Sequence, residues 1–246
     1  LDGFAFDDVE GMRAAGIDTE EVVRVGMRGF TEGCMVHGIF HGDLHGGNLM
    51  VLPDGRIGLL DHGITARMTP LERNAFLRLM LMGASGDIAG QVAALRDLGA
   101  LPADVDIREI IRDLGLDKAP IDPTTLDQDE LVGEIQRIIK ALMGYGARLP
   151  KILMLYVKNL VFLDGAISRL APDLDLIGEF ANISTHMAMN YGDQLASELG
   201  VDPATLSADK DAIKASFGIV DDSTDSVTYA ELQARRDLIR KRLTRR

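Results

Sequence analysis

The spacing of apolar residues along the chain predicts a mainly helical protein. Between residues 19 and 38 apolar positions recur at roughly helical intervals, and Asp18 or Thr19 can cap the start of that helix. Further helices are predicted at 70–83, 86–98, 105–115, 128–145, 150–170, 174–199 and 228–244, separated by clusters of glycine, proline and aspartate. The segment Thr69-Pro70-Leu71-Glu72 has the N-cap, proline and glutamate of a capping box at the first of these starts.

One short segment interrupts the helical pattern. The apolar runs LMVL (49–52) and IGLL (57–60) flank Pro53-Asp54-Gly55, which is typical of a tight turn between two strands. An antiparallel hairpin about this turn has the pairs Leu52 with Arg56, Val51 with Ile57, Leu49 with Leu59, and Asn48 with Leu60. The predicted fold class is therefore mainly α with a small β-hairpin.

Composition narrows the choice of protein class. A chain of 246 residues with 46% apolar content can bury a sizeable core, and its net charge of −12 disfavours nucleic-acid binding. Cys34 is the single cysteine, so an internal disulfide is excluded, a reducing cytoplasm is expected, and a buried structural thiol is predicted. The most apolar run, 149–163, contains Lys151 and Lys158 and predicts a core helix, being too short and too charged to span a bilayer.

Positive charge is concentrated at the end of the chain. Residues 235–246 contain seven basic side chains and one aspartate, a net charge of +6, which leaves −18 on the preceding residues. Four apolar residues lie among or just before these cations: Leu232, Leu238, Ile239 and Leu243. Two interpretations follow: a solvated helix packed by charge against the acidic body, or a helix that approaches an anionic membrane surface.

The chemistry-bearing residues gather around the hairpin, in the stretch FHGDLHGGNLMVLPDGRIGLLDHG (40–63). The hairpin register brings Asn48 and Asp61 together at its open end. An amide oxygen and a carboxylate are hard ligands that suit Mg²⁺, which completes its octahedron with water and phosphate. Asp43 precedes Asn48 across a glycine-containing loop and can face the same space.

Three interpretations of this stretch were compared. The order His41-x-Asp43-Leu44-x-x-x-Asn48, a hairpin, and Asp61-x-Gly63 matches the catalytic loop and metal-binding turn of the protein-kinase fold. Residues 42–46 also resemble the G-D-x-H-G of two-metal phosphoesterases, but the second aspartate motif and the later G-N-H-[DE] of that class do not occur in the sequence. Surface loop polars with structural histidines would leave the joint spacing unexplained.

The wider chain resembles one family within the kinase fold. HGDLHGGN alone is similar to aminoglycoside and choline-type phosphotransferases as well. Together with LDGFAFDDVEGMRAAGID (1–18), VLPDGRIGLLDHG (51–63) and LPKILMLYVKNLVFLDGAISRLAPDLDL (149–176), it resembles the UbiB/AarF-type atypical kinases from residue 1 to about residue 180.

This resemblance implies a set of roles. Asp43 corresponds to the catalytic-loop aspartate, Asn48 and Asp61 to the ligands of Mg²⁺ in a Mg²⁺-ATP site, and His41 and His45 to the motif histidines. It further implies an ATP-dependent phosphotransferase or ATPase that supports isoprenoid-quinone or other membrane-lipid metabolism. The alternatives are a small-molecule phosphotransferase of the aminoglycoside or choline kinase type, and a non-catalytic nucleotide-sensing scaffold.

Two residues depart from the family pattern. Gly46 stands where the family usually has proline, and His62 where it usually has phenylalanine. The glycine is expected to loosen the loop slightly. The histidine replaces a packing ring with one that can titrate near neutrality, which puts the setting of the metal-binding turn in doubt.

The domain prediction follows from which parts of a two-lobed kinase site the sequence contains. The first lysine is Lys118 and no G-x-G-x-x-G occurs, so we expect the phosphate-covering loop and its lysine to lie in a small lobe before Leu1. The chain is predicted to be the large lobe (1–190) with a helical extension and basic tail (191–246). The expected partners are that small lobe, nucleotide and a membrane surface. The expected location is cytoplasmic, peripheral at the inner face of the membrane. The chain alone is expected not to catalyse phosphoryl transfer.

Overall fold

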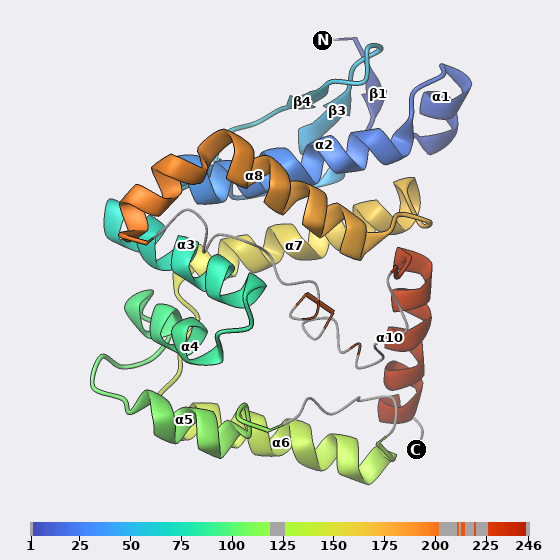
Figure 1. Ribbon diagram of the computed structural model, residues 1–246. Helices are drawn as coiled ribbons and strands as arrows, with labels where there is room; N and C mark the ends of the chain where they lie inside the picture. The colour runs from blue at the N-terminus through green and yellow to red at the C-terminus, as the bar shows by residue number, and fades with distance from the viewer. Residues whose placement is uncertain are drawn as a thin grey trace.

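The part of the protein that a computed structural model describes is helical, with five very short strands (Figure 1). The structure describes residues 2–118, 126–201, 211, 213–214, 219 and 226–244. The helices are α1 (Val9–Ala14), α2 (Thr19–Glu32), α3 (Pro70–Ala84), α4 (Ile88–Asp97), α5 (Ile107–Leu114), α6 (Gln128–Gly144), α7 (Lys151–Leu170), α8 (Leu176–Leu199) and α10 (Tyr229–Thr244). The strands are β1 (Phe4–Ala5), β2 (Ile39–His41), β3 (Leu49–Val51), β4 (Ile57–Leu59) and β5 (Thr65–Arg67).

Every helix predicted from the sequence is present, with ends that differ by a few residues. The Thr69–Glu72 capping box forms at the start of α3, so that prediction is confirmed. The helix predicted over 19–38 is α2 continued by a π-helical turn, Gly33–His37, which ends at Gly38 in the left-handed region with φ of 63°. Helix α1 was not predicted, because six residues are too few to show a helical period in the apolar positions. The boundary predicted at residue 190 falls inside α8, which continues as one helix to Leu199.

The predicted hairpin is confirmed in its register. Strands β3 and β4 pair Leu49 with Leu59 and Val51 with Ile57, and the Leu60 N–H donates to the Asn48 carbonyl over 2.8 Å. The sequence did not indicate that β1 pairs with the other edge of β3, nor that β2 and β5 form a second antiparallel pair. Strands of two or three residues are too short to show an alternating pattern. Along the chain, the hairpin thus lies between the two strands of a second sheet, which pair directly with each other.

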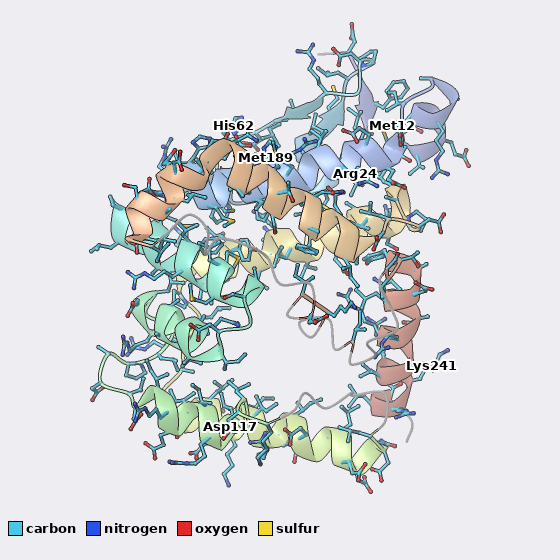
Figure 2. All side chains as sticks on the ribbon, viewed as in Figure 1. Met12, Arg24, His62, Asp117, Met189 and Lys241 are labelled. Carbon is cyan, nitrogen blue, oxygen red and sulfur yellow. The ribbon has the colours of Figure 1, made fainter. Side chains whose placement is uncertain are left out.

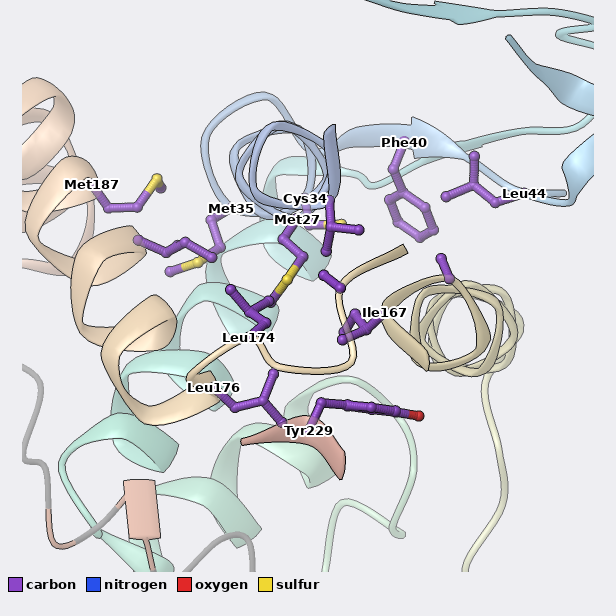
Figure 3. Packing of buried hydrophobic residues seen from close by; sticks show 14 of the residues in the cluster. Met27, Cys34, Met35, Phe40, Leu44, Ile167, Leu174, Leu176, Met187 and Tyr229 are labelled. Carbon is purple, nitrogen blue, oxygen red and sulfur yellow. The ribbon is translucent and has the colours of Figure 1, made fainter. Parts of the chain in front are cut away.

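The main hydrophobic core joins α2, α7, α8 and the strand that enters the catalytic loop (Figure 3). Phe40 of β2 and Leu44 of the loop point into this core, so the backbone on both sides of Asp43 is anchored by apolar burial. Cys34 is 1% exposed, and burial raises the pKa of its thiol far above the usual range. The prediction of a buried structural thiol is confirmed.

The helices form a series of neighbours that leads away from this core and back to it (Figure 1). Helix α3 packs on α4, α4 on α5, α5 on α6, α6 on α10, and α10 on α7. Helix α8 contacts α2 and α3. There the Arg24 guanidinium of α2 (labelled in Figure 2) ion-pairs with Glu179 of α8, whose buried carboxylate is thereby compensated.

Helix α10 packs through its first turns against the body. Tyr229 and Leu232 are buried. The Arg236 guanidinium ion-pairs with Asp164 of α7, and the Arg242 guanidinium donates a hydrogen bond to the Leu126 carbonyl. These contacts agree with a charged helix packed against an acidic body. The final two residues of the basic tail lie outside the described residues.

Two leucines on the same helix, Leu238 and Leu243, remain exposed. Within the described ranges, none of the helices is both long enough and apolar enough to cross a membrane.

Candidate functional site

The strands place the two halves of the motif beside each other. Strand β2 ends at His41 and continues into the loop that carries Asp43, while β5 begins just after the turn that carries Asp61. The β2–β5 pairing sets His41 opposite Thr65, and the Gly42 N–H donates to the Ile64 carbonyl over 2.8 Å. The β3–β4 hairpin lies between these strands along the chain, and the β2–β5 pairing fixes the segments before and after it.

His41 joins the loop that carries Asp43 to the turn that carries Asp61. Its Nδ1 accepts a hydrogen bond of 3.1 Å from the Asp43 N–H. The proton must then reside on Nε2, which lies 3.2 Å from the Leu60 carbonyl oxygen and 3.0 Å from that of Asp61. The ring is buried and both nitrogens are engaged by backbone. His41 therefore links the two segments through backbone hydrogen bonds.

Helix α7 holds the catalytic loop from the opposite side. The amide of Asn159, with no exposed surface, accepts a 3.1 Å hydrogen bond from the Leu44 N–H and donates one to the His41 carbonyl. The neighbouring Lys158 ammonium ion-pairs with the Asp43 carboxylate. That hydrogen bond, together with the Lys158 charge, lowers the pKa of Asp43, so the carboxyl is ionised at neutral pH.

The segment between Asp43 and Asn48 is shaped by local hydrogen bonds. His45 is exposed, and its Nδ1 accepts a 3.1 Å bond from the Gly47 N–H at the start of a 3₁₀ turn, Gly46–Asn48. The Asn48 amide nitrogen donates to the Asp43 carbonyl over 3.0 Å. This bond orients the amide so that its oxygen is the atom left for a cation.

Asp61 occupies a backbone conformation that few residues adopt. Its φ of 48° makes it the one non-glycine residue with positive φ in the described part of the chain. Aspartate tolerates this left-handed region better than most residues, and such conformations are concentrated at functional turns. One carboxylate oxygen accepts a 3.1 Å hydrogen bond from the Gly63 N–H, and the side chain is exposed. The turn thus leaves the Asp61 carboxylate exposed, one residue after Leu60, whose N–H pairs with the Asn48 carbonyl.

These features agree with the comparisons to known proteins. Residues 1–94, which include the loop and the hairpin, match the family model described as ABC1 atypical kinase-like domain. The chain belongs to the ABC1/AarF atypical kinase-like family. The kinase-like fold expected from the motif order is therefore confirmed at the level of the family.

Several relatives cover most of the chain. An uncharacterised protein of Mycobacterium tuberculosis, Rv0647c, is 31% identical over 199 residues, which are 77% of this chain and 40% of that protein. Two Arabidopsis thaliana proteins are similar: aarF domain-containing protein kinase At5g05200 (29% identical, over 56% of this chain and 30% of that protein) and ACTIVITY OF BC1 COMPLEX KINASE 1 (23%, over 72% and 26%). The chain spans less than half the length of these relatives. No solved structure gives a significant match.

The donor set at the site suits magnesium better than a transition metal. Within the described ranges, no three histidine, cysteine, aspartate or glutamate side chains gather closely enough to hold a metal ion by themselves. The oxygen donors are instead the exposed Asp61 carboxylate and the amide oxygen of Asn48, a residue that is 7% exposed. Mg²⁺ is commonly bound by one or two carboxylates together with substrate phosphates and water, so the residues present fit that ion.

The two departures from the ABC1/AarF pattern have different surroundings. A Cβ atom at Gly46 would meet nothing within 4 Å, so space does not require glycine at this position. The His62 side chain is exposed, and its ring centroid lies 5.6 Å from that of His41 with the planes tilted by 58°. His62 therefore packs beside the residue that joins the two halves of the site.

Lys158 and Asn159 are site residues that the sequence analysis did not identify. The apolar run that contains them predicts a core helix, and the charge of Lys158 disfavours a membrane span. A signal was present, because an asparagine in a long apolar helix has to find hydrogen-bond partners if it is buried. Which backbone groups those partners are was decided by tertiary packing over 115 residues of sequence.

We predict that Asn159→Ala destabilises the protein by about 2–4 kcal/mol, because it leaves the Leu44 N–H and the His41 carbonyl buried without partners. Urea unfolding of the two variants Asn159→Ala and Asn190→Ala measures this cost. Asn190 is exposed on α8, so its substitution should change the free energy of unfolding by under about 0.5 kcal/mol. Equal stabilities for the two variants would show that the loop does not depend on Asn159.

Proposed function

We propose that the complete protein carrying this chain binds Mg²⁺-ATP and transfers its terminal phosphoryl group, to a hydroxyl acceptor or to water. The observation that supports this best is the double engagement of His41, which couples the Asp43 loop to the Asp61 turn through both ring nitrogens. Phosphoryl transfer depends mainly on positioning and charge stabilisation, and a rigid pair of loops serves both.

In this proposal each side chain has a separate task. Asp43 orients the attacking oxygen and accepts its proton, and the ionised state of its carboxyl suits that task. Asn48 and Asp61 hold the cation through side-chain oxygens, and His41 and His45 position the backbone around them. Bound Mg²⁺ would neutralise negative charge on the phosphates.

The substrate class is part of the same proposal. We propose that the complete protein supports isoprenoid-quinone or membrane-lipid metabolism, and the resemblance to UbiB/AarF proteins is the support for this. A small-molecule phosphotransferase and a non-catalytic nucleotide sensor are the competing functions. The phosphate-contacting lysine of the small lobe is expected from the part of the complete protein that precedes this chain.

The metal role is tested with Asp61→Asn in the complete protein. Removing the carboxylate charge should weaken binding of Mg²⁺-ATP by at least tenfold, because the cation bridges the nucleotide to the protein. Isothermal titration calorimetry with and without Mg²⁺ measures the effect. The neighbouring exposed charge provides a control, since Asp54→Asn at the hairpin turn should leave the affinity unchanged. An unaltered affinity in Asp61→Asn would contradict the metal assignment.

The role of Asp43 is tested by the separation of turnover from binding. Asp43→Asn should lower kcat by about 10²-fold or more, which is typical of the loss of a general base, while Mg²⁺-ATP affinity changes little. Steady-state kinetics and calorimetry on the same sample separate the two quantities. If wild type and Asp43→Asn both bind nucleotide without turnover, the nucleotide-sensing scaffold is the better description.

We further propose that α10 brings the protein to an anionic membrane surface. The supporting observation is that Arg240 and Lys241 are exposed next to the exposed Leu238, whereas Arg236 and Arg242 are engaged by the body. Each basic residue near an anionic surface contributes roughly 1 kcal/mol.

Arg240→Ala with Lys241→Ala should therefore weaken co-sedimentation with anionic vesicles by about thirtyfold at low salt, since two such residues together contribute roughly 2 kcal/mol. The control removes two exposed lysines elsewhere, Lys140→Ala with Lys151→Ala. If this control weakens binding equally, the attraction is not specific to α10. If neither variant loses binding, α10 does not serve as a membrane contact.

A further inference from the structure

We propose that Lys158 is a catalytic residue that donates hydrogen bonds from its ammonium to the phosphoryl group in transfer. This inference rests on the proposed phosphoryl-transfer function and adds a residue that lies outside the motif and on a different helix. It is carried by where α7 holds the Lys158 ammonium, by the exposure of that group, and by the distribution of charge around it.

The position of Lys158 is fixed by its neighbour. Asn159 binds the loop backbone on both sides of Asp43, at Leu44 and at His41, so the α7 backbone at residue 158 has a set distance from the Asp43 carboxylate. The Lys158 ammonium ion-pairs with one oxygen of that carboxylate. Asp43 is where the attacking oxygen would be held, and the phosphorus under attack must lie next to that oxygen. A cation on Asp43 is therefore close to the oxygens of the phosphoryl group.

The ion pair contributes little as a structural contact. The Lys158 side chain is 52% exposed and that of Asp43 29% exposed, and exposed ion pairs add little to stability because water screens them and both side chains lose freedom. The same exposure leaves the ammonium able to move from the carboxylate to an incoming anion. A compact ammonium on a flexible stem suits such a movement.

The charges near the loop favour this task for Lys158. ATP brings several negative charges to a site that already holds the Asp43 and Asp61 carboxylates. Three arginines of neighbouring elements are engaged elsewhere: Arg24 with Glu179, Arg56 with Asp54, and Arg73 with Glu198. Of the groups that lower the pKa of Asp43, Lys158 has the largest effect, followed by His45 and His41.

The step can be written with its atoms in balance. The acceptor oxygen, from a hydroxyl group or water, forms a bond to the terminal phosphorus of ATP. The bond from that phosphorus to the bridging oxygen breaks, its electron pair remains on ADP, and the acceptor proton passes to the Asp43 carboxylate. Lys158 forms no covalent bond and keeps its proton. It contacts the non-bridging oxygens, where negative charge is spread in the transition state.

The experiment uses three variants of the complete protein: Lys158→Met, Lys158→Arg and Lys151→Met. Lys151 is exposed on the same helix two turns earlier, so it controls for loss of one positive charge on α7. The measurements are kcat and KM for ATP, the affinity for Mg²⁺-ADP, and the gain in that affinity when aluminium fluoride is added as a mimic of the transferring phosphoryl group. Urea unfolding of each variant confirms that the fold is kept.

If the inference is correct, Lys158→Met lowers kcat by about 10²-fold or more, with a change in KM of no more than a few-fold. Its affinity for Mg²⁺-ADP stays at the wild-type value, and the gain from aluminium fluoride is lost. Lys158→Arg keeps part of the turnover and part of the aluminium fluoride gain, and Lys151→Met keeps both at the wild-type values. A purely structural ion pair would not affect the aluminium fluoride gain selectively.

Other outcomes overturn the inference. Unchanged turnover and an unchanged gain in Lys158→Met would show an ordinary surface ion pair, and faster turnover would show that Lys158 blocks Asp43. If Asp61→Asn and Asp43→Asn behave as proposed while Lys158→Met behaves like wild type, only this inference fails. If the wild-type protein neither binds Mg²⁺-ATP nor turns it over, the proposed function fails and this inference fails with it.

Discussion

The buried amide of Asn159 is the contact on which the geometry of the site depends. It satisfies one backbone donor and one backbone acceptor on the two sides of Asp43, in a place where water has no access. A loop with this many glycines has little conformational preference of its own, so its shape must come from outside. The amide provides that shape and at the same time ties α7 to the loop, which brings Lys158 to the Asp43 carboxylate.

The second constraint is the direct pairing of the two strands that flank the hairpin in the chain. Strands β2 and β5 precede and follow the β3–β4 hairpin and pair with each other, so the loop before the hairpin and the turn after it start from neighbouring strands. His41 then links the loop and the turn through hydrogen bonds between both of its ring nitrogens and backbone groups. The left-handed backbone of Asp61 is kept in place by this arrangement, although it is unfavourable for an isolated residue. The site is thus a rigid unit built from strands of only three residues.

The family relationship and the structure support different parts of the account. The match to the ABC1 atypical kinase-like domain covers residues 1–94 and so includes the loop, the hairpin and Asp61. Helix α7, with the Lys158–Asn159 pair, lies beyond that match and is connected to the site by tertiary contacts. In this chain, a helix distant in sequence therefore contacts the same loop that carries the motif.

The sequence by itself determined the local elements and the identity of the motif residues. Helix periods, the Thr69–Glu72 capping box and the Pro53-Asp54-Gly55 turn are encoded within a few neighbouring residues, and the hairpin register follows from the turn alone. For this reason the sequence predicts the pairing of Asn48 with Leu60, the residue before Asp61. What only the tertiary structure decided is how separate elements meet: the β2–β5 pairing, the π-helical turn before the loop, and the approach of α7 to Asp43. Those arrangements depend on packing between segments up to 115 residues apart, and no local pattern in the sequence records which buried polar group will pair with which.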